Sequence, residues 1–264
     1  MNDKDIAALA DRIAEARRSR KVIDFLAADA AVLSEADAYK VQFAVHDRLT
    51  AGGNDRMAGW KVALTLPSQY EPLKLSGPVF AGIYGSGVRP TGTVFEKGWP
   101  LKAGIECEMV AEMAKDAPAG GAPYSADSIK DHVGKLYCGA EVVENRYSDV
   151  TKVGGPARIA DDVLQAACIL GNEIVDWKTL DFAAVQGRSE FEGKEIGAGP
   201  GTNVMGGAMI ALAWLANKLI EHGKHLKAGD VVLTGSVHPP VFLPGPGVAK
   251  TEFVGLGGSS ITVR

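Results

Sequence analysis

Two glutamates interrupt an otherwise apolar segment near the middle of the chain. The segment reads LKAGIECEMVAEM (residues 101–113), and Glu106 and Glu108 lie two residues apart within it. Side chains alternate between the two faces of a β-strand, so both carboxylates point to one face while Cys107 and Met109 point to the other. Ionised carboxylates are costly to bury unless a cation compensates them. The pattern therefore raises the question of what compensates two carboxylates on this face of the strand.

A third acid, Glu141, lies in a second apolar segment, CGAEVVEN. Three glutamates converging from two buried strands would repel one another. Mg²⁺ or Mn²⁺ is the natural counter-ion, because hard divalent cations prefer carboxylate oxygen. The competing interpretation places the acids on a solvent-facing side of the strand, paired with Lys102 or Arg146. An E-x-E spacing alone favours that second interpretation, because the spacing is common.

The elements that position these acids can be read from the rest of the chain. The first 56 residues are expected to be helical, since apolar residues between Ile6 and Ala16 recur at the helical period. Ser34 followed by Asp37 is an N-cap signal for another helix. From residue 57 onward the chain changes to short β-type segments separated by glycine and proline, such as MAGWKVALT and LYCGAEVVENRY.

The later part of the chain adds further expected elements. A helix is expected over residues 125–133, residues 159–170 fit either a helix or a buried strand, and Glu192-Gly193 marks a tight turn. Residues 203–222 show the strongest helical pattern. Helices first, then many strands with one long late helix, are typical of an α+β fold. We expect a single catalytic domain over residues 1–264, with a helical N-terminal portion (1–56) and a β-rich metal-site body (57–264).

The composition limits the classes of partner. A net charge of -4 and a pI near 5.8 provide no basic field for nucleic acid or an anionic membrane. The chain has no 18-residue apolar window, and its N-terminus lacks the apolar core of a signal peptide. The three cysteines are far apart and show no CxxC spacing, which argues against disulfides or a zinc site. These features predict a cytoplasmic protein with no nucleic-acid or membrane partner.

The order of the segments resembles that of a known family. GWKVALT, GIECEMVAEM, GAEVVENRYSD, AWLANKLIEHG and LKAGDVVLTGSV occur in this order in the chain. They resemble the 2-oxopent-4-enoate hydratase and 4-oxalocrotonate decarboxylase family, within the fumarylacetoacetate hydrolase superfamily. The resemblance covers residues 59–264 and makes metal binding by Glu106, Glu108 and Glu141 the preferred interpretation. It also implies a mixed β roll around the metal site, in a homo-oligomer.

The resemblance implies a chemistry as well. Substrates of the family are small 2-oxo acids or their dienols from the meta-cleavage of aromatic compounds, and Mg²⁺ or Mn²⁺ stabilises the enolate that forms as a proton moves. Hydration of a 2-hydroxy-2,4-dienoate to a 4-hydroxy-2-oxo acid is the expected reaction. Decarboxylation of the 4-oxalocrotonate type and C–C hydrolysis stay open. So does a weakly active or structural partner subunit of a hydratase–decarboxylase complex.

Further site residues are expected around the acids. Lys61 matches the family's active-site lysine, which would hold the substrate carboxylate or move protons; without the resemblance it would be an exposed strand lysine. The expected substrate contacts are Thr65, Thr234, Gly235 and Ser236, as hydroxyls that can donate and a glycine that allows close backbone approach. His238, where relatives carry threonine, is either a base of near-neutral pKa or a polar surface residue.

One feature departs from the family pattern, and one property of the substrate stays open. Relatives carry an acid in a Gln-Pro-Asp-Tyr-Gly-like run before the E-x-E strand, whereas Pro78 is followed here by Val79. The missing acid weakens the expectation of ordinary pentenoate hydration. A substrate with a second carboxylate would need a further basic contact, for which Arg89, Arg146 and Lys250 are the candidates.

Overall fold

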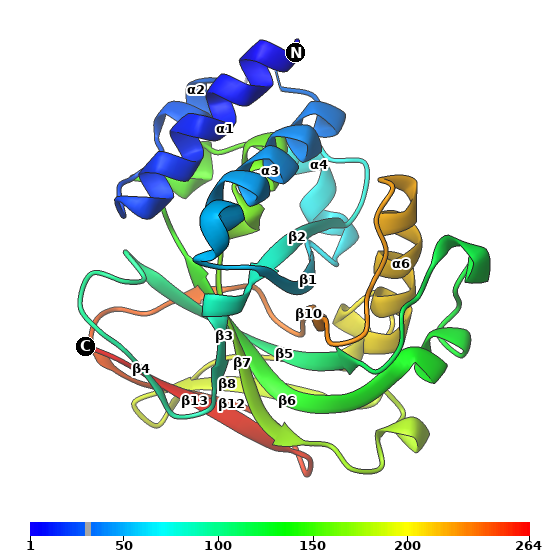
Figure 1. Cartoon of the computed structure of the whole chain (residues 1–264). Helices are drawn as coiled ribbons and strands as arrows, with labels where there is room; N and C mark the ends of the chain where they lie inside the picture. The colour runs from blue at the N-terminus through cyan, green and yellow to red at the C-terminus, as the bar shows by residue number, and fades with distance from the viewer. Residues whose placement is uncertain (30–32) are drawn as a thin grey trace.

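The computed structural model describes residues 1–29 and 33–264 (Figure 1). Its α-helices are α1 (Asp3–Arg18), α2 (Phe25–Asp29), α3 (Glu35–Thr50), α4 (Tyr70–Leu73), α5 (Gly155–Ala160) and α6 (Ala208–Glu221). Its strands are β1 (Met57–Ala63), β2 (Val79–Tyr84), β3 (Val88–Pro90), β4 (Thr93–Phe95), β5 (Ala103–Met113), β6 (Val133–Glu144), β7 (Gln165–Glu173), β8 (Gln186–Phe191), β9 (Lys194–Pro200), β10 (Val231–Ser236), β11 (Val241–Phe242), β12 (Gly247–Phe253) and β13 (Gly257–Val263). The expected α+β class is confirmed.

The N-terminal helices form where the sequence signals them. Ile6, Leu9 and Ile13 lie on the buried face of α1, and the Ser34 hydroxyl accepts a hydrogen bond from the Asp37 amide at the start of α3. This bond satisfies one of the amides that have no partner within the helix. The two helices lie together over one end of the larger sheet (Figure 1).

The larger sheet carries the acidic strands at its centre. Its strand order is β2-β1-β10-β5-β6-β7-β3, with β11 paired to β5. The pairs β1–β10 and β3–β7 are parallel and the others are antiparallel, so the sheet is mixed. The register of β5 against β6 places Glu106 directly opposite Glu141.

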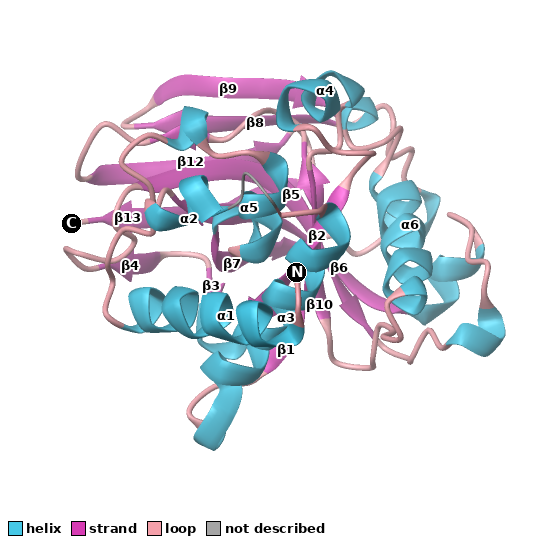
Figure 2. Cartoon of the chain, turned by 90° about the horizontal axis from the view of Figure 1, so that it is seen from above, coloured by secondary structure: helices cyan, strands magenta, loops and turns pink. Residues whose placement is uncertain are grey.

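A second sheet packs against the first. Its order is β4-β13-β12-β8-β9, and Figure 2 shows these strands running side by side. The Thr251 hydroxyl on β12 donates to the Gly139 carbonyl on β6 at 3.0 Å, which joins the two sheets. Buried apolar side chains from both sheets, including Ile105, Val142 and Ile261, form one cluster. This core fixes β5 and β6, and with them the strand positions of the acids.

Two expectations need correction, and one open alternative is answered. The region around 125–133 contains a 3₁₀ turn, Ser128–His132, in place of an α-helix, although the Ser125 and Ser128 side chains accept from each other's backbone amides as a helix cap would. The ambiguous segment 159–170 is both structures in turn: α5 ends, a 3₁₀ turn spans Asp162–Leu164, and β7 begins. The long helix starts at Ala208 rather than at residue 203, because Gly206 and Gly207 have positive φ.

Helix α6 is apolar because it is a core helix. The segment Gly201–Glu221 is the one part of the described chain whose length and composition would suit a membrane span, but 56% of that window is buried. Leu212, Leu215 and Leu219 on α6 are fully buried in the main apolar cluster.

Candidate functional site

The three glutamates come together in the lining of one pocket, on strands β5 and β6 of the larger sheet. One carboxylate oxygen from each of Glu106, Glu108 and Glu141 lies within 4.8 Å of the others. Glu108 and Glu141 are each 1% exposed, whereas Glu106 is partly accessible. The acids therefore do not lie on a solvent-facing side of the strand. Of their alternative partners, Lys102 contacts the Phe242 ring and Arg146 pairs elsewhere.

The cluster holds more negative charge than its surroundings neutralise. Burial raises the pKa of Glu106 to about 8, with the Glu141 carboxylate adding to the effect and Lys61 opposing it. Burial and the two neighbouring carboxylates also raise the pKa of Glu108, although the Gly235 amide donates to its Oε2 at 2.9 Å. When all are ionised, the three carboxylates and one ammonium carry a combined charge of -2.

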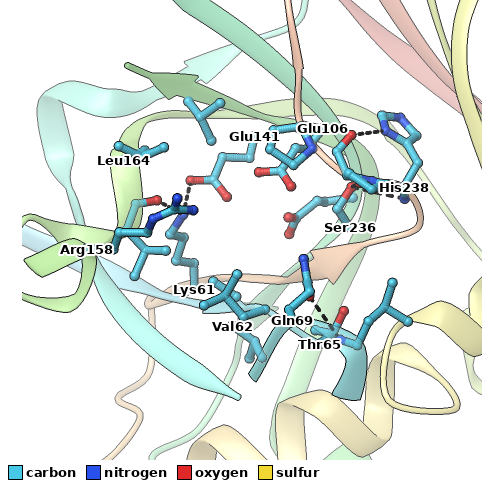
Figure 3. Close-up of a pocket in the computed structure, with 18 residues that line it drawn as sticks. Lys61, Val62, Thr65, Gln69, Glu106, Glu141, Arg158, Leu164, Ser236 and His238 are labelled. Atoms are coloured by element: carbon cyan, nitrogen blue, oxygen red, sulfur yellow. Dashed lines mark hydrogen bonds and ion pairs between the residues drawn. The ribbon is translucent and has the colours of Figure 1, made fainter. Parts of the chain in front are cut away.

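The donor set fits a hard divalent cation. Carboxylate oxygens are the ligands that Mg²⁺ and Mn²⁺ prefer, and a dication would bring the charge of the cluster to zero. Glu106 faces the pocket, so a cation held there would be reachable by substrate (Figure 3). Glu106, Glu108 and Glu141 are thus the residues that could hold a metal.

Lys61 is fixed in the pocket by two acceptors. It is 1% exposed, and its Nζ donates to Glu141 Oε1 at 2.6 Å and to the Val163 carbonyl at 2.8 Å. The register of β1 between β2 and β10 directs this side chain toward β6 rather than toward solvent. The interpretation of Lys61 as an exposed strand lysine is therefore wrong.

The Val163 carbonyl is presented by an unusual turn. Asp162, Val163 and Leu164 all have positive φ (53°, 47° and 65°), a conformation that costs non-glycine residues energy. Surrounding contacts must therefore hold the turn in place. Val163 and Leu164 line the pocket as a consequence.

Asp162 supplies those contacts. Its Oδ1 accepts from His46 Nε2 at 2.6 Å and from the Gly82 amide at 3.1 Å, and its Oδ2 accepts from Arg17 Nη1 at 2.6 Å. Burial raises the pKa of this carboxyl, but His46, Arg17 and the amide outweigh burial and place the pKa below its ordinary value. The N-terminal helices α1 and α3 are thereby tied to the pocket wall.

The expected substrate contacts divide into two groups. Thr65 and Ser236 line the pocket, with the Thr65 hydroxyl donating to the Asn203 carbonyl and the Ser236 hydroxyl to the His238 carbonyl. Thr234 does not line it, because its buried hydroxyl donates to the Met109 carbonyl. Gly235 contacts the site through a hydrogen bond from its backbone N–H to the Glu108 carboxylate.

His238 lines the pocket with both ring nitrogens engaged. Nδ1 lies 2.7 Å from the Pro239 carbonyl and must donate to it, so Nε2 accepts from the Ser189 hydroxyl at 2.7 Å. Burial lowers the pKa of His238, against the opposing effect of the Pro239 carbonyl. The ring is 4% exposed and neutral, so it is no surface residue.

The structure also places Val79, which stands where relatives carry an acid, and the three basic residues expected to contact a second carboxylate. Val79 is fully buried opposite Ala63, and no residue of β2 lines the pocket. Arg89 and Lys250 are exposed on strands away from the pocket, and Arg146 is buried in ion pairs with acids outside the cluster. None of the three expected cations reaches the site.

Two pocket residues were missed by sequence reasoning. Arg158, from α5, and Gln69, from the turn before α4, both line the pocket (Figure 3). Gln69 Oε1 accepts from the Leu66 amide, which leaves its amino group directed into the cavity. An arginine within the apolar run PARIA was the available signal for Arg158.

Comparisons with known proteins agree with this architecture. A 2-keto-4-pentenoate hydratase from Paraburkholderia phymatum is 27% identical over 259 residues, covering 97% of this chain and 96% of the relative. A 4-oxalocrotonate decarboxylase from Pseudomonas putida is 26% identical over 261 residues, covering 98% and 97%. The structure of 4-oxalocrotonate decarboxylase from Pseudomonas putida G7, complexed with magnesium and adipate, matches with a TM-score of 0.91 at 22% identity, covering 100% of this chain and 99% of the other.

The family model confirms the resemblance and the expected β roll. The model described as fumarylacetoacetate (FAA) hydrolase C-terminal matches residues 66–264, which include the acidic cluster. With more than half of the sequence matched and the fold shared along its whole length, this chain belongs to the fumarylacetoacetate hydrolase family.

Proposed function

We propose that this chain is a divalent-metal-dependent lyase that acts on a small 2-oxo acid or its dienol. The observation that carries the proposal is the cluster of three carboxylates within 4.8 Å of one another, open to a pocket that also holds a buried lysine. The similar hydratases and decarboxylases are lyases of the meta-cleavage pathways, and one such decarboxylase structure contains magnesium.

The residues divide the chemical work between them. Glu106, Glu108 and Glu141 would hold Mg²⁺ or Mn²⁺, which when bound supplies Lewis-acid polarisation of the substrate's 2-oxo group. Lys61 Nζ lies where it can contact a substrate carboxylate or pass a proton, with Glu141 Oε1 as its charge partner. The apolar part of the pocket wall, including Val62 and Leu164, would limit the access of water around a bound substrate and so strengthen these electrostatic contacts.

Hydration of a 2-hydroxy-2,4-dienoate is the first candidate reaction. In it, a proton is delivered to the dienol and water then adds at the far end of the unsaturated ketone. Lys61 and Ser236 are the polar groups placed to serve these steps, together with the amide of Gln69. A homo-oligomer acting in the cytoplasm remains part of the proposal.

Decarboxylation is the second candidate, and the composition of β2 favours it. Hydration needs a group that delivers or activates water, and no carboxylate from β2 lines the pocket. Loss of CO₂ leaves the same enolate but requires no activated water. One site could therefore support either reaction.

Parallel turnover measurements test the proposal. With Mg²⁺ present, the dienol absorbance of 2-hydroxypenta-2,4-dienoate and the release of CO₂ from 4-oxalocrotonate would be followed, with the metal-free protein as control. Metal-dependent loss of the dienol without CO₂ supports hydration, and metal-dependent CO₂ release supports decarboxylation. Silence on both substrates would contradict this choice of reactions and favour a partner subunit or a C–C hydrolase.

A further inference from the structure

Strand β10 departs from regular pairing beside the acidic cluster. The register of β10 against β5 shifts between Leu233 and Ser236. Over this interval two residues of β10, Thr234 and Gly235, lie opposite one residue of β5, Met109. An extra residue of this kind makes a β-bulge, which turns groups of the bulged strand out of the ladder and is frequent beside active sites. The pair Thr234-Gly235 is the β10 bulge.

The bulge directs a backbone amide at a carboxylate. Gly235 N donates to Glu108 Oε2 at 2.9 Å, whereas an amide in a regular ladder would donate to a carbonyl of the neighbouring strand. Glu108 is 1% exposed, so bulk water hardly competes for this bond. The bulge therefore holds one oxygen of a carboxylate in the acidic cluster, while Oε1 has no hydrogen bond from the described part of the chain.

The Thr234 side chain fastens the bulge to β5. Its hydroxyl is fully buried and donates to the Met109 carbonyl at 3.1 Å. This bond joins the two strands at the position where their backbone register is interrupted. Thr234 does not line the pocket, so its hydroxyl acts on the strand and not on a ligand.

Position 235 leaves no room for a side chain. Gly235 has a φ of 111°, a conformation that residues with a Cβ rarely adopt. A Cβ at this position would lie 2.7 Å from Thr65 Cγ2 and 3.2 Å from Val204 Cγ1. The first distance is too short to persist, so either the bulge or Thr65 would have to move. The direction of the amide toward Glu108 therefore depends on glycine.

We propose that the β10 bulge positions a ligand of the metal site, with Gly235 orienting the Glu108 carboxylate and Thr234 holding the bulge in place. This inference rests on the proposed function, because it requires a divalent cation at the acidic cluster. It gives both residues of the bulge a role different from the substrate contacts expected from the sequence. Hydrogen bonds that orient a ligating carboxylate typically raise metal affinity by about 10- to 100-fold.

The affinity for Mn²⁺ in the absence of substrate tests the inference. Isothermal titration calorimetry of Mn²⁺ into the metal-free protein gives the Kd, which Gly235→Ala is expected to raise about 10- to 100-fold. Gly229→Ala is the matched control, since Gly229 also has a positive φ, 86°, and a Cβ there would meet nothing within 4 Å. An unchanged Kd in Gly235→Ala, or an equal rise in Gly229→Ala, would overturn the inference.

A second pair of variants decides the matter where Gly235→Ala does not fold. Thr234→Val removes the hydroxyl that donates to Met109 and should raise the Kd for Mn²⁺, whereas Thr234→Ser keeps the hydroxyl and should bind Mn²⁺ as the wild type does. Equal Kd values in the two Thr234 variants would overturn the inference alone. A wild-type protein that binds no Mn²⁺ would overturn the proposed function as well, so the two failures are distinguishable.

Discussion

At the scale of single residues, the acidic cluster has a cost that a bound cation would remove. Glu106 is the most accessible of the three acids that line the pocket, and its pKa of about 8 reflects burial beside Glu141. A metal that binds the folded but not the unfolded state raises the free energy of unfolding. The increase is about 2.7 kcal/mol when the free metal concentration is one hundred times the dissociation constant. Replacing one carboxylate should therefore weaken the effect of metal on stability.

We predict that Glu106→Gln reduces the Mg²⁺-induced rise in Tm. The amide keeps the shape of the side chain but supplies neither the charge nor the second acceptor oxygen. Differential scanning fluorimetry with increasing Mg²⁺ measures the effect. Glu112→Gln, on the same strand but outside the pocket, is the matched control and should retain the full rise. Equal rises in the two variants would remove Glu106 from the metal site.

The residues differ in how far the sequence revealed them. Glu106 and Glu108 could be predicted from the sequence because a two-residue spacing in a strand fixes a shared face. The resemblance pointed to Lys61. Arg158 and Gln69 could not be predicted, because each comes from a short segment whose direction depends on packing against distant parts of the chain.

At the scale of elements, the left-handed turn Asp162–Leu164 explains why part of the chain resisted prediction. Three consecutive residues with positive φ interrupt any helical or strand period, so residues 159–170 showed neither pattern clearly. By contrast, α1, α3, β5 and β6 follow regular periods and formed as expected. The glycines before α6 had a similar effect on a smaller scale, since they delay the start of the helix.

We predict that Asp162→Asn destabilises the protein by about 3–5 kcal/mol, the range for removing one partner of a buried ion pair. The variant leaves Arg17 and His46 near a neutral amide, because Asp162 is fully buried between them. Urea denaturation gives the change in unfolding free energy. Asp149→Asn, in an exposed pair with Lys152, is the control and should change stability far less. Equal effects would show that the buried network does not hold the turn.

At the scale of the whole molecule, the acidic cluster should make stability depend on pH. Burial raises the pKa of Glu106, Glu108 and Glu141, so the metal-free folded state keeps protons that the unfolded state has released. Stability then falls as pH rises, from the unfolded pKa near 4.5 up to about 8 for Glu106. Asp162 has a lowered pKa, and its contribution is lost only at acid pH below this window.

We predict that Tm falls between pH 5.5 and pH 8 when the protein is kept in EDTA. Saturating Mg²⁺ should reduce or reverse the fall, because ionised carboxylates are then compensated. Thermal melts at several pH values, with and without Mg²⁺, measure both effects. A Tm in EDTA that stays flat or rises over this window would contradict the raised pKa values of the cluster.

The turn that carries Val163 also bears on how such an enzyme can change. The group that anchors the Lys61 ammonium is a peptide carbonyl, so no exchange of the Val163 side chain can delete it. Neighbours on the same wall, Arg158 and Leu164, contribute side chains, so substitution there changes the lining of the cavity directly. Substitutions on this wall can therefore change which substrate fits the cavity while the Lys61 ammonium keeps its carbonyl acceptor. Substrate selectivity can change in this way without an intermediate variant that has lost the lysine's position.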